Sequence, residues 1–420
     1  MVHREHCGGG RYPAVLAAKL ALFLAIATGT AGLSQAQTFT VIHDFTRYQD
    51  GFSPVAVTID GAGVLYGSTG LGGNYTQTCS AGCGTVFKLR HTGSGWLLST
   101  LYAFTNLRDG SMPGAVALGP DGTLYGATRT GNAFNLRPPP TPCHAVQCPW
   151  TFNLLYQFAG GDDGWLPAVA APVLDHAGNL YGMTQLGGGL CPGNGCGTVY
   201  ELVRSGGTWT ENVLHRFNGS DGADPYWSGV TMDSAGNLYG TTPGGGPHNF
   251  GVVFQLTNSG GSWSENVLYD FPEGDASKGR YPQGGVILDG SGNLFGTAAY
   301  GGRLNGGTAF ELPAPGFSFS LLYSFAGPGG QSGSYGKLTF GPDGALYGTT
   351  LRDGAYGVGT VFKLTPSGGG WTYTSLHDFT GGDDGAGPNS SVVFDAQGNL
   401  YGTTLTAGMH GAGVVFEITP

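Results

Sequence analysis

Charge is scarce in this chain, and no cluster of lysine and arginine follows its N-terminal segment. Asp, Glu, Lys and Arg make up 10% of the 420 residues, and the formal net charge is −10 at pH 7. A protein that binds nucleic acid or an anionic membrane surface carries a concentrated basic patch. The composition therefore argues against nucleic acid and membrane lipid as partners.

A second long apolar run is also missing. The apolar run at 20–33 is short for a membrane span, follows Arg4, Arg11 and Lys19, and precedes the small residues of 34–36. This order is typical of a secretory signal. We interpret 1–36 as a signal peptide that is cleaved before Gln37, and we expect an exported chain without a membrane insertion.

Local catalytic signatures are missing as well: the sequence has no HExxH, GxSxG or phosphate-binding loop motif. This argues against the enzyme classes that such motifs identify. It does not exclude an enzyme that gathers its catalytic groups from distant parts of the chain.

Glycine and aromatic residues, by contrast, are plentiful. The chain has 81 Gly, and it has 20 Tyr, 23 Phe and 7 Trp. A disordered Gly-rich chain would lack the aromatic residues. The glycines are better explained by many tight turns, where a positive φ is required.

A short phrase, Leu-Tyr-Gly or Leu-Phe-Gly, recurs at intervals of 52 to 59 residues. Its seven copies lie at 65–67, 124–126, 180–182, 238–240, 294–296, 346–348 and 400–402. A regular period of this size indicates a repeat architecture.

Each repeat contains four strand-like runs. In the fifth repeat they are 284–289, 293–298, 307–312 and 317–325, and Asp-Gly-Ser-Gly between the first two is typical of a hairpin turn. The first and third runs are almost continuously apolar, as in strands covered on both faces. The fourth alternates like an outer strand, and in 263–271 we expect Trp263, Val267, Tyr269 and Phe271 to share one face.

Seven repeats of four antiparallel strands predict an all-β fold, a seven-bladed β-propeller formed by 37–420 as a single domain. An open β-solenoid is the alternative. The segment 38–45 resembles a fourth run, whereas the chain ends at 413–420 in a third run. A solenoid would leave both with exposed edges, so we expect a ring whose last blade is closed by the N-terminal strand.

The repeat units D-x-x-G-N-L-Y-G-T-T, C-G-T-V-F-K-L and L-Y-x-F…D-G-A-x-P resemble the Gloeobacter/Verrucomicrobia-type ("GloVer") tandem repeat of exported bacterial proteins. The resemblance covers essentially all of 38–420. It implies a bacterial protein that is secreted, periplasmic or held at the cell surface. It implies no activity, and it brings no catalytic residues.

Six cysteines follow the signal segment, in three local pairs: Cys79 with Cys83, Cys143 with Cys148, and Cys191 with Cys196. Export favours disulfides. Metal binding is the alternative, but the spacings are not CxxC and only His144 adjoins a pair. We predict three local disulfides, one of them in a protruding loop at 137–149.

Two sets of loops would share one face of the propeller. The links from a fourth strand to the next first strand carry aspartates at matching positions: Asp50, Asp109, Asp163, Asp221 and Asp384. These form either a ring near the axis that binds a cation such as calcium or a polyhydroxy ligand, or ordinary Asp-Gly turns. No other cofactor is implied.

The second-to-third strand links vary more, and they carry the residues that we predict to bind a ligand: His248, Arg303, Arg352, His410, Tyr75, Tyr300 and Tyr356. An irregular, partly aromatic surface on a rigid ring suits a ligand. The two histidines lie in distant repeats and do not define a metal site by spacing. His43, His215 and His377 replace the repeat's Tyr in the fourth strand, so we read them as structural.

Two functions remain. The first is a monomeric exported module that binds a glycan, peptide or protein, or that serves as an envelope scaffold. The alternative is an extracellular lyase or hydrolase with its site on the face that carries the second-to-third strand loops. Acid and base groups with shifted pKa values gathered at the axis would favour the enzyme.

Overall fold

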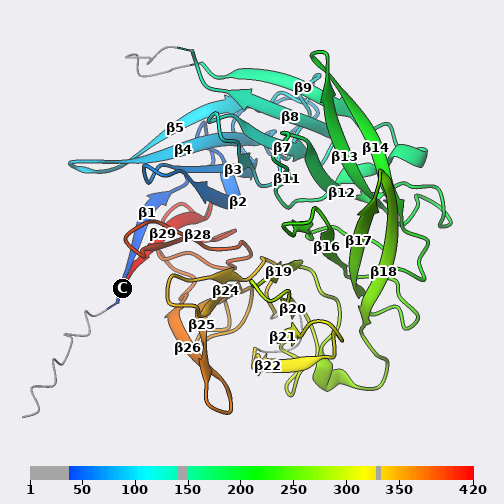
Figure 1. Cartoon of the computed structure of the whole chain (residues 1–420). Helices are drawn as coiled ribbons and strands as arrows, with labels where there is room; N and C mark the ends of the chain where they lie inside the picture. The colour runs from blue at the N-terminus through cyan, green and yellow to red at the C-terminus, as the bar shows by residue number, and fades with distance from the viewer. Residues whose placement is uncertain (1–36, 141–148, 328–332) are drawn as a thin grey trace, which may run out of the picture. The chain divides into compact units, whose positions relative to one another are not determined.

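The computed structural model describes residues 37–140, 149–327 and 333–420. In this part of the chain the strands form seven separate antiparallel sheets arranged in a ring (Figure 1), and the helical segments are the 3₁₀ turns η1 (Gly161–Asp163) and η2 (Ala276–Lys278). The predicted seven-bladed β-propeller is therefore confirmed. The proposed signal peptide and the pair Cys143 and Cys148 lie outside the described residues.

We number the blades along the chain, and each blade runs from its inner to its outer strand. Blade 1 holds β2 (Phe52–Ile59), β3 (Leu65–Leu71), β4 (Thr85–Thr92) and β5 (Gly95–Ala103); blade 2 holds β6 (Ala117–Leu118), β7 (Leu124–Thr128), β8 (Asn132–Arg137) and β9 (Thr151–Gln157). Blade 3 has an inner strand in two pieces, β10 (Trp165–Pro167) and β11 (Val173–Leu174), followed by β12 (Leu180–Leu186), β13 (Thr198–Ser205) and β14 (Thr208–Arg216).

Blade 4 holds β15 (Thr231–Met232), β16 (Leu238–Thr242), β17 (Val252–Ser259) and β18 (Ser262–Asp270); blade 5 holds β19 (Val286–Leu288), β20 (Leu294–Ala298), β21 (Thr308–Leu312) and β22 (Ser320–Ser324). Blade 6 holds β23 (Thr339–Phe340), β24 (Leu346–Thr350), β25 (Thr360–Ser367) and β26 (Gly370–Asp378). Blade 7 holds β27 (Val393–Phe394), β28 (Leu400–Thr403), β29 (Val414–Thr419) and, as its outer strand, β1 (Thr38–Asp44).

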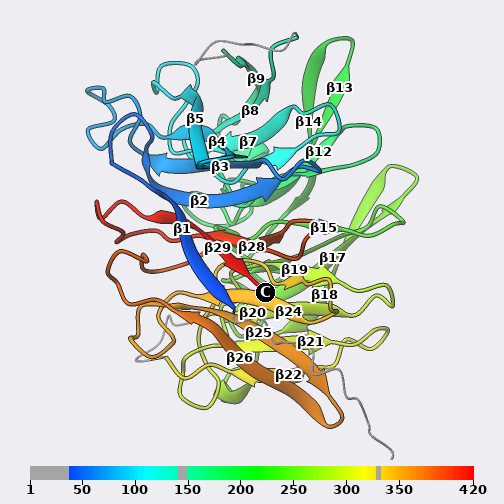
Figure 2. The same cartoon turned by 90° about the vertical axis from the view of Figure 1, so that its left-hand side faces the viewer.

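Blade 7 is closed by the N-terminal strand, as predicted. Strand β1 pairs antiparallel with β29 in a register that runs from Thr38 opposite Thr419 to Asp44 opposite Val414, and the two strands lie side by side in Figure 2. The segment that follows the proposed signal therefore supplies the fourth strand that the C-terminal repeat lacks. This pairing covers the edge of β29 that would otherwise be open.

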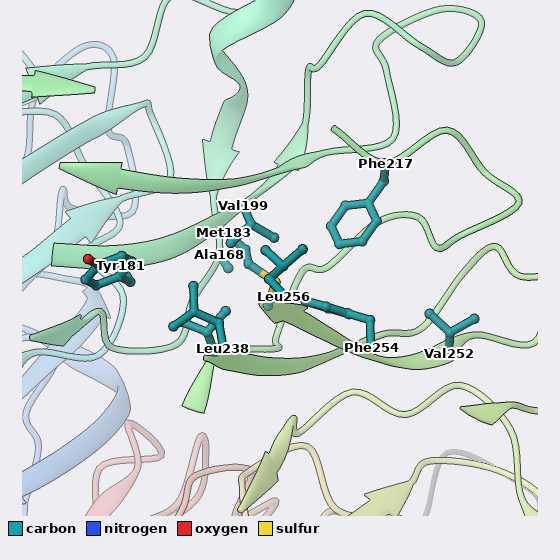
Figure 3. Packing of buried hydrophobic residues seen from close by; sticks show 10 residues of the cluster. Ala168, Tyr181, Met183, Val199, Phe217, Leu238, Val252, Phe254 and Leu256 are labelled. Atoms are coloured by element: carbon teal, nitrogen blue, oxygen red, sulfur yellow. The ribbon is translucent and has the colours of Figure 1, made fainter. Parts of the chain in front are cut away.

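The glycine of the repeated Leu-Tyr-Gly phrase makes room for an aromatic ring. Gly240 lies opposite Phe254, and a Cβ at Gly240 would lie 2.6 Å from Phe254 Cζ. The Phe254 ring in turn packs edge-on against Phe217 of the preceding blade, with ring centroids 5.2 Å apart (Figure 3). The same contact between neighbouring blades recurs around the ring, in the pairs Phe45–Phe87, Phe104–Phe134, Phe158–Tyr200, Phe271–Phe310, Phe325–Phe362 and Phe379–Phe416.

The Asp-x-x-Gly-Asn part of the phrase builds the first hairpin turn. In blade 4 the Asp233 carboxylate accepts hydrogen bonds from the backbone of Ala235 and Asn237, each at 2.9 Å, and from the Tyr239 hydroxyl at 3.2 Å. Gly236 supplies the positive φ of 84° that the turn requires. The phrase therefore recurs because it specifies a hairpin and its packing.

The outer strand at 263–271 does not place its large apolar side chains on one face, as the sequence predicted. Trp263 packs toward Tyr181 of blade 3, whereas Tyr269 stacks on Phe319 of blade 5, so these side chains do not share a face. The cause is a β-bulge, because Phe254 pairs with Val267 and Val253 pairs with Tyr269, leaving Leu268 unpaired. The same bulge recurs in every blade, at Ile42, Leu101, Leu155, Leu214, Leu322 and Leu376.

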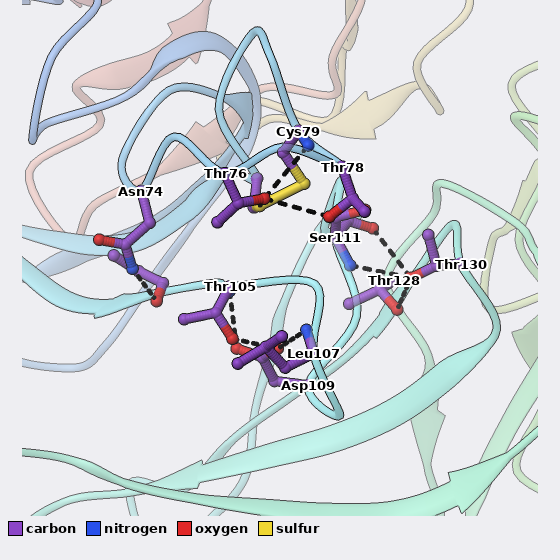
Figure 4. The surroundings of a disulfide bond; sticks show 12 residues. Asn74, Thr76, Thr78, Cys79, Thr105, Leu107, Asp109, Ser111, Thr128 and Thr130 are labelled. Carbon is purple, nitrogen blue, oxygen red and sulfur yellow. Dashed lines mark hydrogen bonds between the residues drawn. A yellow bond between two sulfur atoms is a disulfide. The ribbon is translucent and has the colours of Figure 1, made fainter.

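Two of the predicted disulfides are present, Cys79–Cys83 and Cys191–Cys196. Each lies in a second-to-third strand loop. The first also binds the neighbouring loop, because Cys83 O accepts a hydrogen bond from Met112 N at 2.9 Å, and Figure 4 shows that loop, with Asp109, beside the disulfide. Across the described residues, no helix has the length and apolar character to cross a membrane.

Candidate functional site

The five aspartates of the fourth-to-first strand links each bind their own loop and the outer strand that leads into it. Asp109 accepts hydrogen bonds from Thr105 N at 2.8 Å and from the Tyr102 hydroxyl at 3.0 Å. The equivalents make the matching contacts: Asp50 with Thr46 and His43, Asp163 with Ala159 and Tyr156, Asp221 with Asn218 and His215, and Asp384 with Thr380 and His377.

These aspartates are not gathered at one site. Among the described residues, the one group of three or more His, Cys, Asp or Glu side chains close enough to share a metal ion is His215, Asp221 and Glu265. Asp221 is the one member of the five that belongs to it. The turn contacts account for the recurrence of Asp at this position.

His248 and His410 occupy equivalent loops, as the sequence indicated, but at the outer edge of two blades. His248 Nδ1 contacts the carboxylate of Asp270, and His410 Nδ1 lies 3.3 Å from that of Asp44, where each aspartate ends an outer strand. The side chains are 42% and 48% exposed. The structure does not bring the two histidines together.

Three more of the predicted ligand-binding residues are exposed on loops. The Tyr75 hydroxyl donates to Arg47 O, and the residues Tyr75 and Tyr356 are 51% and 63% exposed. Arg303 is exposed and is held through its backbone N–H, which donates to Ser324 Oγ at 2.6 Å. None of these contacts is directed to the axis of the ring.

A channel runs along that axis, and none of the predicted ligand-binding residues lines it. Its volume is about 490 Å³, and its walls come from the first strands and the preceding links of all seven blades. Most lining residues are small or aliphatic, including Val55, Ala115, Val169 and Ser390. Ligand sites of a few hundred Å³ are commonly concave, largely apolar and pre-formed.

On one side of the channel mouth, the lining residues are large and aromatic instead of small or aliphatic. Blades 4 and 6 place Trp227 and Tyr335 there, with ring centroids 5.9 Å apart, where other blades carry small residues. Burial, with a smaller contribution from Tyr300, raises the pKa of Tyr335, and Arg352 acts in the opposite direction. Tyr300 and Arg352 therefore lie near enough to Tyr335 to affect its pKa, but neither is among the residues that line the channel.

Lys337 lies deeper in the channel and crosses from blade 6 to blade 4. Its Nζ donates to Val230 O at 2.7 Å and to Thr231 Oγ1 at 2.8 Å. Burial lowers the pKa of Lys337 to about 8. Gly285 of blade 5 admits the side chain, because a Cβ there would lie 2.9 Å from Lys337 Cε.

Arginines adjoin the aromatic side of the mouth. The Arg129 guanidinium lies 4.1 Å from the centroid of the Tyr226 ring, and Tyr226 packs edge-on against Trp227. Arg280 lies over Phe250, at 5.6 Å. Such cation–π contacts hold the two guanidinium groups against their aromatic rings. Among the described residues that line the channel there is no carboxylate and no histidine.

Sequence reasoning missed Trp227, Tyr335 and Lys337. The sequence does differ at these positions. Two repeats read PYWSG (225–229) and SYGKL (334–338), whereas other repeats read PVAV, PGAV and PNSSV. The second-to-third loops vary more along the sequence, whereas the segments that form the wall of the channel resemble ordinary core segments.

Comparison with known proteins identifies the family. The model of the Gloeobacter/Verrucomicrobia repeat matches residues 76–290 and 281–420, so the chain belongs to this family. No curated protein matches the chain.

Solved structures show the same fold at low identity. One is the extracellular domain of a one-component system from B. thetaiotaomicron, with a TM-score of 0.52 and 10% identity over 91% of this chain and 40% of that chain. Another is a puromycin hydrolase, with a TM-score of 0.52 and 13% identity over 84% of this chain and 50% of that chain. The chain thus spans half or less of these two proteins, and the similarity shows the propeller fold alone.

Proposed function

We propose that the protein is an exported binding module that holds an acidic glycan at the mouth of its central channel. The observation that carries this proposal is the one-sided replacement of small lining residues by Trp227, Tyr335 and Lys337. A ring of near-identical blades has no structural need for such asymmetry. A departure confined to the cavity wall is the feature expected of a ligand site.

The chemistry of the mouth suits sugars. Trp and Tyr rings offer flat apolar faces with a polar edge, and a sugar ring likewise combines an apolar face with hydroxyl groups. Asn389, Ser390 and Ser391 of blade 7, which packs against the Tyr335–Lys337 segment of blade 6, add polar groups to the channel wall. The cavity accommodates the end or a short stretch of a chain, whereas a protein partner would require a broad surface.

The charge of the mouth favours an anionic ligand. Lys337 lines the channel, Arg352 is near enough to lower the pKa of Tyr335, and no described lining residue carries a negative charge. This local positive charge stands against a formal net charge of −10 for the chain. A carboxylate on a uronic or sialic acid residue would complement it.

The two disulfides and the relation to an extracellular domain support export. The enzymatic alternative, a lyase or hydrolase, requires acid and base groups in the cavity. The described lining residues offer only Lys337 and Tyr335 as titratable groups, and these do not form an acid–base pair.

The test is a glycan array probed with the purified protein, with neutral and uronic or sialic acid oligosaccharides printed side by side. We expect acidic glycans to bind, Trp227→Ala to weaken binding by at least about 10-fold, and Lys337→Met to abolish the preference for acidic over neutral sugars. Because the pKa of Lys337 is about 8, raising the pH from 7 to 9 should weaken wild-type binding and leave Lys337→Met unchanged.

His410→Ala provides the comparison at the outer edge and should bind like the wild type. Thermal unfolding of each variant checks that the fold is retained. Binding that survives Trp227→Ala but is lost in His410→Ala would move the site to the peripheral loops, and an array without any bound glycan would refute the proposed ligand class.

A further inference from the structure

One position on each outer strand faces the preceding blade, and its residue type changes around the ring. It is aromatic in four blades, Leu in one and Glu in two: Phe39, Leu98, Phe152, Glu211, Glu265, Phe319 and Tyr373. The aromatic members stack on the Tyr or His of the preceding blade, as Phe39 does on His377 at 3.6 Å and Phe319 on Tyr269 at 5.3 Å. The aromatic members thus make an apolar contact at this position. In blade 4 the position is instead occupied by Glu265, which faces His215.

Glu265 completes a group of three metal-binding side chains. His215 comes from β14, Asp221 from the link after that strand, and Glu265 from β18 of the next blade. His215 Nε2 lies 3.2 Å from Asp221 Oδ2, and one ligand atom of each residue lies within 4.8 Å of the others. The described residues contain no second such group.

The polar atoms of this group lack other partners. His215 Nε2 and Glu265 Oε1 are both buried and make no hydrogen bond. Asp221, in contrast, is held in place by Asn218, whose backbone N donates at 2.9 Å and whose Nδ2 donates at 2.6 Å. His215 Nε2 has the Asp221 carboxylate beside it, whereas Glu265 Oε1 has no partner among the described residues. A buried polar atom without a partner is costly, and a cation among the three side chains would satisfy it.

The other blades show which residue makes the difference. The pairs His43 with Asp50 and His377 with Asp384 have the same arrangement, but they face Leu98 and Phe39. In the interface of blades 2 and 3, Glu211 is present, but Tyr156 stands in place of the histidine and donates to Asp163. Within the described part of the chain, an imidazole and two carboxylates therefore meet only at the interface of Glu265 and His215.

We propose that His215, Asp221 and Glu265 bind a divalent transition metal ion, with zinc as the best fit, across the interface of blades 3 and 4. Imidazole nitrogen and carboxylate oxygen are both zinc ligands, and three protein ligands leave the fourth tetrahedral position to water. Calcium would require roughly six to eight oxygen ligands. Zinc bonds of about 2.0–2.2 Å need the three atoms drawn closer by about 1 Å, and the partly exposed side chains leave room for this movement.

The experiment measures zinc binding by the purified, chelator-treated protein without a histidine tag. Isothermal titration calorimetry with zinc sulfate gives stoichiometry and affinity, and cobalt(II) substitution gives a visible absorption spectrum that reports the ligand geometry. The test variant is Glu265→Leu, because Leu98 shows that the repeat accepts leucine at this position. The matched control is Glu211→Leu, which makes the same change in the preceding blade.

We expect one zinc ion per wild-type chain, at least about 10-fold weaker binding in Glu265→Leu, and wild-type binding in Glu211→Leu. Zinc should raise the melting temperature of the wild type and of Glu211→Leu, because a ligand that binds the native state stabilises it. The absence of saturable zinc binding in the wild type, or equal binding in Glu265→Leu, would overturn the proposal.

Discussion

At the scale of single residues, the repeat uses each of its recurring side chains for a specific contact. Asp233 accepts the hydrogen bonds of its hairpin turn, Gly240 leaves space for the Phe254 ring, and Tyr239 donates back to Asp233. The turn role of the aspartate could be predicted from the sequence, because Asp and Gly have local conformational preferences. The role of Gly240 could not, because the ring that it accommodates comes from the next strand.

We predict that Gly240→Ala destabilises the protein by about 1–3 kcal/mol, the usual cost of forcing an extra methyl group into a packed core. The new Cβ would lie 2.6 Å from Phe254 Cζ. Gly290→Ala is the control, since a Cβ there meets nothing within 4 Å, and it should be close to neutral. Urea unfolding of both variants checks this, and equal stabilities would contradict the packing role of Gly240.

The residues of the candidate site were harder to predict. Trp227, Tyr335 and Lys337 lie in the links just before the first strands β15 and β23, which read as ordinary core segments in a linear sequence. When the blades close into a ring, these segments come to line one shared channel. A large side chain in such a segment then becomes part of the candidate site. Tyr300 and Arg352 stay predictions, whereas His248 and His410 contact aspartates at the ends of outer strands.

At the scale of strands, the outer-strand bulge decides what neighbouring blades offer each other. Because Leu268 is skipped in the pairing, Trp263 faces blade 3 and Tyr269 faces blade 5. A strict two-residue alternation predicted one shared face and was wrong. The recurring Leu before the Tyr or His was a visible break in the pattern, but its meaning depends on pairing that the sequence alone does not show.

The interface of blades 2 and 3 should make stability depend on pH through Glu211. Burial, together with the nearby Asp163 charge, raises the pKa of Glu211 from 4.5 to about 7, and Arg216 acts in the opposite direction. Tyr156 and Tyr200 also face this carboxyl group. Between these two pKa values the native state keeps a proton that the unfolded state has released, so the free energy of unfolding falls as the pH rises and levels off above 7.

We therefore predict that Glu211→Gln flattens the decline in stability between pH 5 and pH 8. The measurement is urea unfolding at several pH values, with a chelator present throughout. Glu273→Gln, at an exposed loop position, controls for the loss of one negative charge and should follow the wild type. A Glu211→Gln profile parallel to that of the wild type would show that Glu211 does not carry this pH dependence.

At the scale of the whole molecule, the ring depends on β1 as much as on any internal strand. The contact between a buried Phe and an aromatic ring of the next blade recurs at every blade interface, and between blades 7 and 1 it is made by Phe45 and Phe87, with ring centroids 5.3 Å apart. The pair between blades 4 and 5 is Phe271 with Phe310, at 5.5 Å. Phe45 and Phe271 are both fully buried. The closing interface is thus built like the interfaces between consecutive blades.

Because the closing interface is built like the others, ring closure can be tested by comparing the stability losses of matched variants at two interfaces. Phe45→Ala and Phe271→Ala should each cost about 3–5 kcal/mol, the usual penalty for removing a buried Phe ring. A terminal strand that only rested on the ring would fray at little cost, because chain ends are generally the least stable parts of a fold. Guanidinium unfolding of the two variants decides the matter: matched losses are expected for a closed ring, and a Phe45→Ala variant as stable as the wild type would mean that β1 does not hold blades 7 and 1 together.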